Sequence, residues 1–257
     1  MQIALTIAGS DSGGGAGIQA DLKTFQRYGV FGTSVLTAIT AQNTLGVTSW
    51  SAVGLDLVRA QLDAVATDLR PAALKSGMLA DADVVGAVAA GIRAHDLGPY
   101  VLDPVMVATS GDLLLEPSAV AAIRELLVPL ADLVTPNLQE AAILVGEPVQ
   151  DLDDMHRAAR RLVELGAGAA LVKGGHLAGA EMVDVLFDGA AQEFRHPRLE
   201  TRSTHGTGCT LSAAVVAHLA LDHGLADAVA RSLDYVHEAI RTAPGLGAGH
   251  GPLNHFA

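Results

Sequence analysis

Short apolar runs alternate with longer amphipathic segments along the chain. The short runs are rich in Val, Ile, Leu and Ala and predict buried strands, whereas the longer segments repeat their apolar residues with helical spacing. We expect strands at residues 3–8, 33–37, 73–77, 100–103, 133–135, 169–173 and 182–187. We expect helices at residues 17–28, 55–69, 82–95, 118–127, 138–144, 153–165, 208–223 and 225–243. This alternation predicts an α/β fold with a mainly parallel central sheet and helices on both faces.

Polar residues follow the predicted strands. No linker, low-complexity tract or repeat interrupts the pattern, so we expect residues 1–257 to form a single domain. In open parallel sheets, ligands bind at the carboxyl ends of the strands. The segments that follow the strands are Gly9-Ser10-Asp11, Asp103-Pro104, Pro136-Asn137 and Lys173-Gly174-Gly175. Their convergence predicts a site at that edge of the sheet.

Composition narrows the class of protein. Half of the 257 residues are apolar but only 4% are aromatic, so Ala, Val, Leu and Ile must fill the core. The formal charge is −12 and Lys and Arg form no cluster, which argues against nucleic acid as a partner. A single cysteine, Cys209, excludes a disulfide framework and a thiolate zinc site within one chain and favours a reducing compartment.

The sequence gives no sign of a targeting or membrane segment. Residues 1–8 lack a basic region and are too short an apolar run for a signal peptide. No apolar run approaches the roughly 20 residues that a membrane span needs. We therefore expect a cytoplasmic protein.

The first glycine-rich segment, GSDSGGGAG at residues 9–17, joins a predicted strand to a predicted helix. Gly15, Gly17 and Ala20 match the spacing of a dinucleotide fingerprint, but residues 33–41 lack the acidic residue that it requires, and no Walker sequence is present. A tight turn explains some of the five glycines, and close approach of a ligand to the backbone explains all of them. Asp21, one turn further on, is either a pocket residue or a solvated acid.

The second glycine-rich segment, THGTGCT at residues 204–210, leads into a helix of small apolar residues that can be buried. A buried helix N-terminus presents unpaired N–H groups and about half a positive charge, so Gly206, Thr207 and Gly208 predict an anion site. The alternative is an ordinary Thr-capped helix start. Cys209 at this position is expected to have a lowered pKa or, alternatively, to be a small core residue.

Five further polar positions allow a structural and a functional interpretation. Asn137 and Glu140 have the spacing of a capping box, and their oxygens also suit the water shell of Mg²⁺. Asp103 ends a strand, where a buried acid needs a partner. Lys173 is either an exposed lysine or a cation for phosphate. Gln42 is either a loop amide or a reader of a heterocycle edge, because an amide both donates and accepts hydrogen bonds.

Together these segments resemble the hydroxymethylpyrimidine/phosphomethylpyrimidine kinases of thiamine biosynthesis, within the ribokinase-like superfamily. The matching stretches cover almost the whole chain in order. They are IAGSDSGGGAGIQADLKTF (7–25), TAQNTLGV (40–47), KSGML (75–79), DPVMVATSGD (103–112), TPNLQEA (135–141), LVKGGH (171–176), THGTGCTLSAA (204–214) and GHGPLNH (249–255). The resemblance implies a three-layer α/β/α fold, ATP, Mg²⁺ and a homodimer. It also implies phosphorylation of 4-amino-5-hydroxymethyl-2-methylpyrimidine and then of its monophosphate.

The resemblance also implies a role for each candidate residue. Gln42 matches the pyrimidine-binding glutamine. The positions that line the pyrimidine pocket match Gly9, Asp21, Met78 and Val105. The phosphate-binding positions match Asn137, Glu140, Lys173, Thr207 and Gly206, and the metal positions match Asp103 and Glu140, partly through water. The transfer centre matches Gly206, Gly208, Cys209 and Lys173.

Two departures and three alternatives accompany the resemblance. Many ribokinase-like enzymes have Asp as the catalytic base where this chain has Cys209, and family members often have Lys where it has Thr109. A pyridoxal or pyridoxine kinase is the nearest alternative, although dual-specificity relatives place a second cysteine at positions 105–110, where this chain has Ala108. A non-catalytic pyrimidine or nucleotide sensor would not need Asp103 or Lys173. A nicotinamide oxidoreductase lacks its ribose-binding acid.

Overall fold

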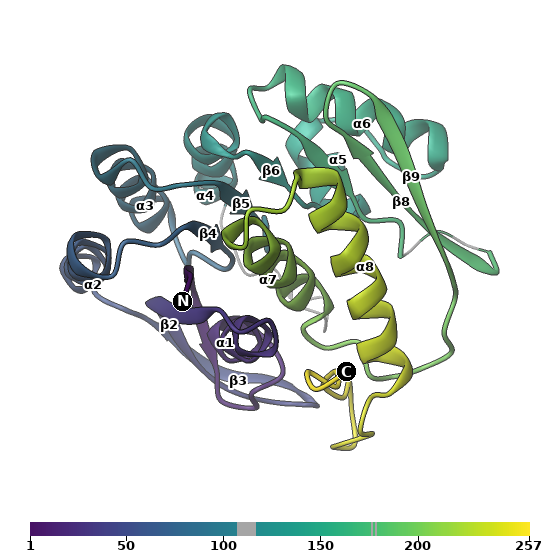
Figure 1. The fold of residues 1–257 in the computed structure, drawn as a ribbon, viewed down its shortest axis with the longest axis horizontal. Helices are drawn as coiled ribbons and strands as arrows, with labels where there is room; N and C mark the ends of the chain where they lie inside the picture. The colour runs from purple at the N-terminus through teal and green to yellow at the C-terminus, as the bar shows by residue number, and fades with distance from the viewer. Residues whose placement is uncertain (107–116, 176, 178) are drawn as a thin grey trace.

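The computed structural model describes residues 1–106, 117–175, 177 and 179–257 (Figure 1). Ala108 and Thr109, which bear on the pyridoxal alternative and on a phosphate contact, lie outside the described residues.

The described strands form one sheet, and its interior is parallel. Their order across the sheet is β3-β2-β1-β4-β5-β6-β7-β8-β9. The neighbouring pairs from β2 through β1, β4, β5 and β6 to β7 are parallel. The pairs β2–β3, β7–β8 and β8–β9 at the two edges are antiparallel. The bounds are β1 Ile3–Asp11, β2 Phe31–Asn43, β3 Gly46–Ala52, β4 Ala73–Ser76, β5 Tyr100–Leu102, β6 Leu133–Val134, β7 Ala170–Val172, β8 Glu181–Phe187 and β9 Ala191–Pro197.

Helices cover both faces of the sheet. One apolar core joins it to α2–α6 and a second joins it to α1, α7 and α8, which gives three layers (Figure 1). Neighbouring strand residues alternate between the two cores, as Ala4 and Leu5 do. The bounds are α1 Gly17–Arg27, α2 Leu55–Asp68, α3 Ala82–His95, α4 Pro117–Ala122, α5 Leu138–Val145, α6 Leu152–Glu164, α7 Thr207–Ala220 and α8 Leu225–Arg241.

The predicted α/β architecture with a mainly parallel sheet is confirmed. The prediction missed the edge strands β3 and β9, because β3 is largely exposed and β9 has Phe194 as its single large apolar residue. It also ended β2 too early, at residue 37 instead of Asn43. The predicted helix 118–127 is α4 followed by a π-helical turn at Ile123–Leu127. No helix in the described part of the chain is long and apolar enough to span a membrane.

Helix α7 is buried on nearly all sides. Ten of its residues are buried, and most are Ala, Val, Ser or Thr. Small side chains let its backbone approach the sheet, where it contacts β1, β4 and β5. The N-terminus of α7 is therefore held beside the carboxyl ends of the central strands.

Two glycines in α3 provide a test of how closely α3 packs against α2. A Cβ atom at Gly86 meets nothing within 4 Å, whereas one at Gly91 would lie 2.1 Å from Cδ2 of Leu62 on α2. We expect Gly86→Ala to raise the free energy of unfolding by up to about 1 kcal/mol, because alanine favours helix. Gly91→Ala should lower it by about 1–3 kcal/mol through overpacking. Urea unfolding compares the two, and equal effects would contradict the close α2–α3 approach.

Candidate functional site

A cavity of about 670 Å³ lies at the carboxyl ends of the parallel strands. It is lined by the segment after β1, the end of β2, and the residues that follow β4, β5, β6 and β7, together with the first turn of α7. Twelve predicted site residues line it. They are Gly9, Gln42, Met78, Asp103, Val105, Asn137, Glu140, Lys173, Gly206, Thr207, Gly208 and Cys209.

The first turn of α7 is open toward this cavity. Its N-cap residue, Gly206, adopts a left-handed conformation with φ 82°, and among the described residues no side chain caps the helix. A Cβ atom on Gly206 would lie 1.8 Å from the carbonyl oxygen of Gly15, so the two glycine-rich segments touch. The next backbone N–H groups, of Gly208 and Cys209, precede the first intrahelical hydrogen bonds. The turn thus combines free donors with the positive end of the helix dipole.

Three charged side chains meet in front of that turn. Lys173 Nζ donates to Asp103 Oδ1 at 3.1 Å, and the other oxygen of Asp103 accepts from Ser212 Oγ at 3.3 Å. Burial lowers the pKa of Lys173, but Asp103 and Glu140 outweigh this effect and raise it, so Lys173 stays charged. Gly208 leaves room for this ammonium, because a Cβ there would lie 3.2 Å from Nζ.

Asn137 and Glu140 form a capping box at the start of α5. Glu140 N donates to Asn137 Oδ1 at 2.9 Å, and Asn137 N donates to Glu140 Oε2 at 2.8 Å. Burial raises the pKa of Glu140 to about 7, partly offset by Lys173. The structural interpretation of this pair is confirmed, and both residues also line the cavity. The cap therefore holds a carboxyl group that titrates near neutral pH.

Another part of the cavity is lined by an amide and by apolar groups. Gln42 comes from the end of β2, and Thr40 Oγ1 lies 3.1 Å from its Oε1. A Cβ on Gly9 would lie 3.5 Å from the sulfur of Met78, so these residues pack without blocking the space between them. This part can accept a flat ring with a polar edge.

These features meet in a chain that also matches known proteins. The family model described as Phosphomethylpyrimidine kinase matches residues 11–254. The chain belongs to the phosphomethylpyrimidine kinase family. A hydroxymethylpyrimidine/phosphomethylpyrimidine kinase of Rhizobium meliloti is 54% identical over 259 residues, covering 99% of this chain and 97% of the relative.

Solved structures agree with this assignment. A phosphomethylpyrimidine kinase of Clostridium difficile has a TM-score of 0.84 at 40% identity, covering 93% of this chain and 100% of the other. An ADP complex of Bacillus subtilis pyridoxal kinase has a TM-score of 0.92 at 39% identity, covering 99% of this chain and 97% of the other. The ribokinase-like fold inferred from the sequence is confirmed, and the chain is a kinase by family.

Asp21 corrects one prediction for this kinase. Its side chain does not line the cavity but is fully buried, with Lys75 Nζ 2.9 Å away and Thr6 Oγ1 2.6 Å away. Lys75, also fully buried, lies 3.5 Å from the carbonyl oxygen of Cys209. Sequence reasoning missed Lys75, although a lysine inside an apolar strand predicts a buried partner. Through Lys75, this buried ion pair contacts the first turn of α7.

Cys209 corrects a second prediction. Burial raises the pKa of its thiol to about 11, and Asp21 and Asp103 add to this while Lys75 opposes it. The expected lowering by the helix N-terminus is outweighed. At neutral pH the side chain is therefore a thiol and not a thiolate.

His205 and Asp11 were also missed as a pair. His205 Nε2 lies 2.9 Å from Asp11 Oδ2, and both residues line the cavity. They are 194 positions apart, so spacing along the chain could not join them. The one available signal was that each belongs to a glycine-rich segment.

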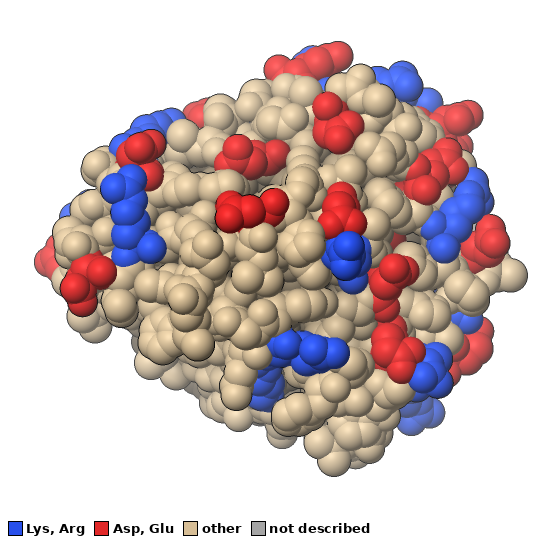
Figure 2. All heavy atoms as spheres, in the orientation of Figure 1, with Lys and Arg blue, Asp and Glu red and all other residues tan. Residues whose placement is uncertain are grey.

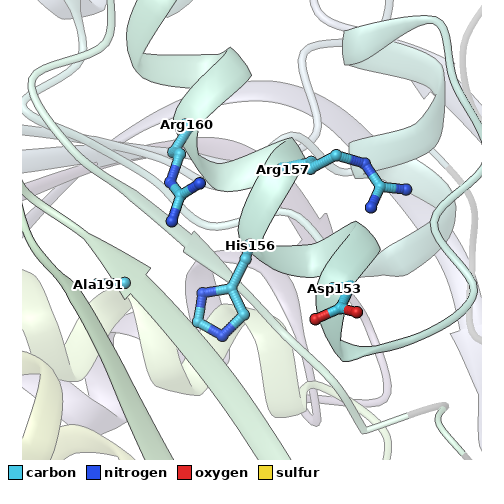
Figure 3. Close-up of a pocket in the computed structure, with 5 residues that line it drawn as sticks. All are labelled: Asp153, His156, Arg157, Arg160 and Ala191. Atoms are coloured by element: carbon cyan, nitrogen blue, oxygen red, sulfur yellow. The ribbon is translucent and has the colours of Figure 1, made fainter.

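Charge on the rest of the molecule is dispersed. On the face in Figure 2, Lys and Arg lie among Asp and Glu and form no continuous basic patch. A second hollow of about 370 Å³ lies between α6 and β9 (Figure 3). Its basic groups are already engaged: His156 with Glu193 at 2.9 Å, and Arg160 over the ring of Phe187 at 5.8 Å.

The raised pKa of Glu140 predicts a pH dependence of stability. In the unfolded chain the carboxyl group has its ordinary pKa of 4.5, and in the folded protein its pKa is about 7. The proton therefore stabilises the fold below that window, and this contribution is lost as pH rises through it, by up to about 3 kcal/mol. In Glu140→Gln that part of the decline between pH 5 and 8 should disappear.

Urea unfolding at a series of pH values measures this effect. Glu147 lies just after α5 and is exposed to solvent. Glu147→Gln should therefore keep the wild-type pH dependence. Parallel curves for wild type and Glu140→Gln would show that the carboxyl group has an ordinary pKa.

Proposed function

We propose that the protein uses ATP to phosphorylate 4-amino-5-hydroxymethyl-2-methylpyrimidine and then phosphorylates the monophosphate to the diphosphate, for thiamine diphosphate biosynthesis. The observation that carries the proposal is a single cavity that is lined both by Gln42 and by the open first turn of α7. The amide of Gln42 suits a pyrimidine edge, and the first turn of α7 suits a phosphoryl group. The name of the Rhizobium relative supports both acceptors.

The nucleotide is proposed to bind at the Asn137 end of the cavity. Asn137, Glu140, Lys173 and Thr207 converge there, and the Bacillus pyridoxal kinase was solved with ADP. Lys173 would neutralise phosphate charge, since its partly exposed ammonium lies beside the transfer centre. Asp103 holds that ammonium in place.

Transfer itself would rest on positioning and charge stabilisation. The N–H groups of Gly208 and Cys209 point from the buried helix end toward the charge that develops on the phosphoryl oxygens. Lys173 adds a full charge 3.1 Å from Asp103. The Cys209 thiol, with its pKa of about 11, is a poor proton acceptor at neutral pH. Proximity then supplies much of the rate.

Mg²⁺ fits the carboxylates at this end. In the part of the chain that the structure describes, no group of three His, Cys, Asp or Glu could hold a metal by itself. Mg²⁺ does not require one, because it keeps several waters and takes one or two carboxylates plus phosphate oxygens. Asp103 and Glu140 supply the carboxylates, and the ion would neutralise charge on the phosphates. A cation there would also favour the ionised form of Glu140.

Pyridoxal kinase is the second candidate, because the Bacillus enzyme has the TM-score of 0.92 given above. The chain has one cysteine, so it lacks the second thiol that dual-specificity relatives use to trap an aldehyde. Comparing hydroxymethylpyrimidine with pyridoxal as acceptor under the same conditions separates the two functions.

The protein is further proposed to act as a cytoplasmic homodimer. Ile39 on β2, Leu45 after β2 and Leu57 on α2 expose 55%, 73% and 58% of their surface. Exposed apolar side chains in one part of a fold favour association. Analytical ultracentrifugation of wild type and Leu57→Glu would test the dimer.

Gln42 provides the first test of the function. In Gln42→Ala the pyrimidine loses its polar partner, so KM for the pyrimidine should rise about tenfold or more while KM for ATP changes less than about twofold. Steady-state kinetics with each substrate varied in turn measures both. Gln150 is exposed and serves as the control through Gln150→Ala. Equal losses for both substrates would refute the pocket assignment.

Cys209 provides the second test. If the thiol does not transfer a proton, Cys209→Ser should keep kcat within about tenfold of wild type, because the backbone donors of the turn remain. A loss of about 10²–10⁴-fold would instead be that of a general acid or base. Product analysis should show mono- and diphosphate for both proteins.

A further inference from the structure

One hydrogen-bond network at the pyrimidine end of the cavity has no role in the transfer described above. It links Asp11, His205, Gln42 and Thr40. The side chain of Asp11 accepts the backbone N–H groups of Gly13, Gly15 and Ala16 at 2.7–3.0 Å. Burial raises the pKa of Asp11, but the His205 hydrogen bond and these N–H groups outweigh it, so the pKa is lowered. Asp11 is thus an ionised acceptor at neutral pH.

An ionised Asp11 determines where His205 carries its proton. The two side chains are 2.9 Å apart between Nε2 and Oδ2. A carboxylate only accepts hydrogen bonds, so Nε2 must be protonated and donate to it. A lone pair on Nε2 would face the carboxylate and be repelled. Nε2 then has no lone pair with which to accept a hydrogen bond from the nearby amide of Gln42.

The amide of Gln42 must then turn its oxygen toward His205. The amide position nearest His205 Nε2, at 3.4 Å, would bring two donors together if it were nitrogen. Exchanging the oxygen and nitrogen leaves the shape of the amide unchanged and resolves this conflict. The nitrogen then lies 3.1 Å from Thr40 Oγ1, which can accept because its own proton goes to Ser10 O at 3.0 Å. In this arrangement the amide nitrogen donates to Thr40, and the amide oxygen faces the Nε2–H group that His205 donates to Asp11.

We propose that His205 and Thr40 lock the amide of Gln42 in one orientation and thereby select a 4-aminopyrimidine over its 4-oxo analogue. This inference rests on the proposed function. The amino compound presents a donor beside a ring-nitrogen acceptor, and the oxo compound presents the reverse order. A fixed amide pairs with only one order, whereas an amide free to turn over pairs with both. Asp11 acts through His205 as a positioning residue.

Binding measurements without nucleotide test the proposal. Calorimetry with the 4-amino and 4-oxo hydroxymethylpyrimidines gives a ratio of Kd values for each protein. The variants His205→Phe and Thr40→Val keep the size of each side chain and free opposite ends of the amide. Each variant should lower the preference for the 4-amino compound by about tenfold, because one hydrogen bond to the partly buried amide supplies about that discrimination. His156→Phe, in the hollow of Figure 3, should leave the ratio unchanged.

A double variant separates this role from direct contact. If His205 acts through the amide, His205→Phe should have no further effect on the Kd ratio in a Gln42→Ala background. A ratio unchanged in both single variants, or a full effect of His205→Phe without Gln42, would overturn the proposal. Wild type that binds the 4-amino compound but does not phosphorylate it would overturn the proposed function alone. Wild type that does not bind it would overturn both.

Discussion

The site depends on one close contact between two glycine residues. Gly206 begins α7 against the carbonyl oxygen of Gly15, and a side chain at Gly206 would need the space of that oxygen. The left-handed backbone at Gly206 adds a second reason for glycine. Because these loops touch, the segment after β1 and the start of α7 form one wall. The ring end and the phosphate end of the cavity are placed relative to each other by that wall.

The architecture could be predicted from sequence because its core strands and helices have strong local patterns. The parallel strands are apolar, and α7 is a run of small apolar residues, so both were recognised. The edge strands β3 and β9 were missed because exposed strands carry no continuous apolar signal. The same rule that placed ligands at the carboxyl ends of strands brought Asp103, Asn137 and Lys173 to one cavity.

What the sequence could not show was which polar groups pair across long separations. A helix N-terminus lowers the pKa of a thiol only when burial and neighbouring charges do not oppose it, and Asp21 and Asp103 do oppose it at Cys209. Asp21 was assigned to the pocket because the family resemblance implies that role, yet it is fully buried against Lys75 and Thr6. Contacts of this kind depend on three-dimensional packing and leave no local pattern.

The buried pair of Asp21 and Lys75 has a consequence for how such a sequence can change over time. Both side chains have no exposed surface, so losing either one leaves a buried charge without its opposite charge. Replacing both by apolar residues of similar size removes the charges together and avoids that penalty. Positions 21 and 75 should therefore co-vary among homologues, with either both charges kept or both exchanged. A lineage that reached one substitution first would need a compensating change before it could persist.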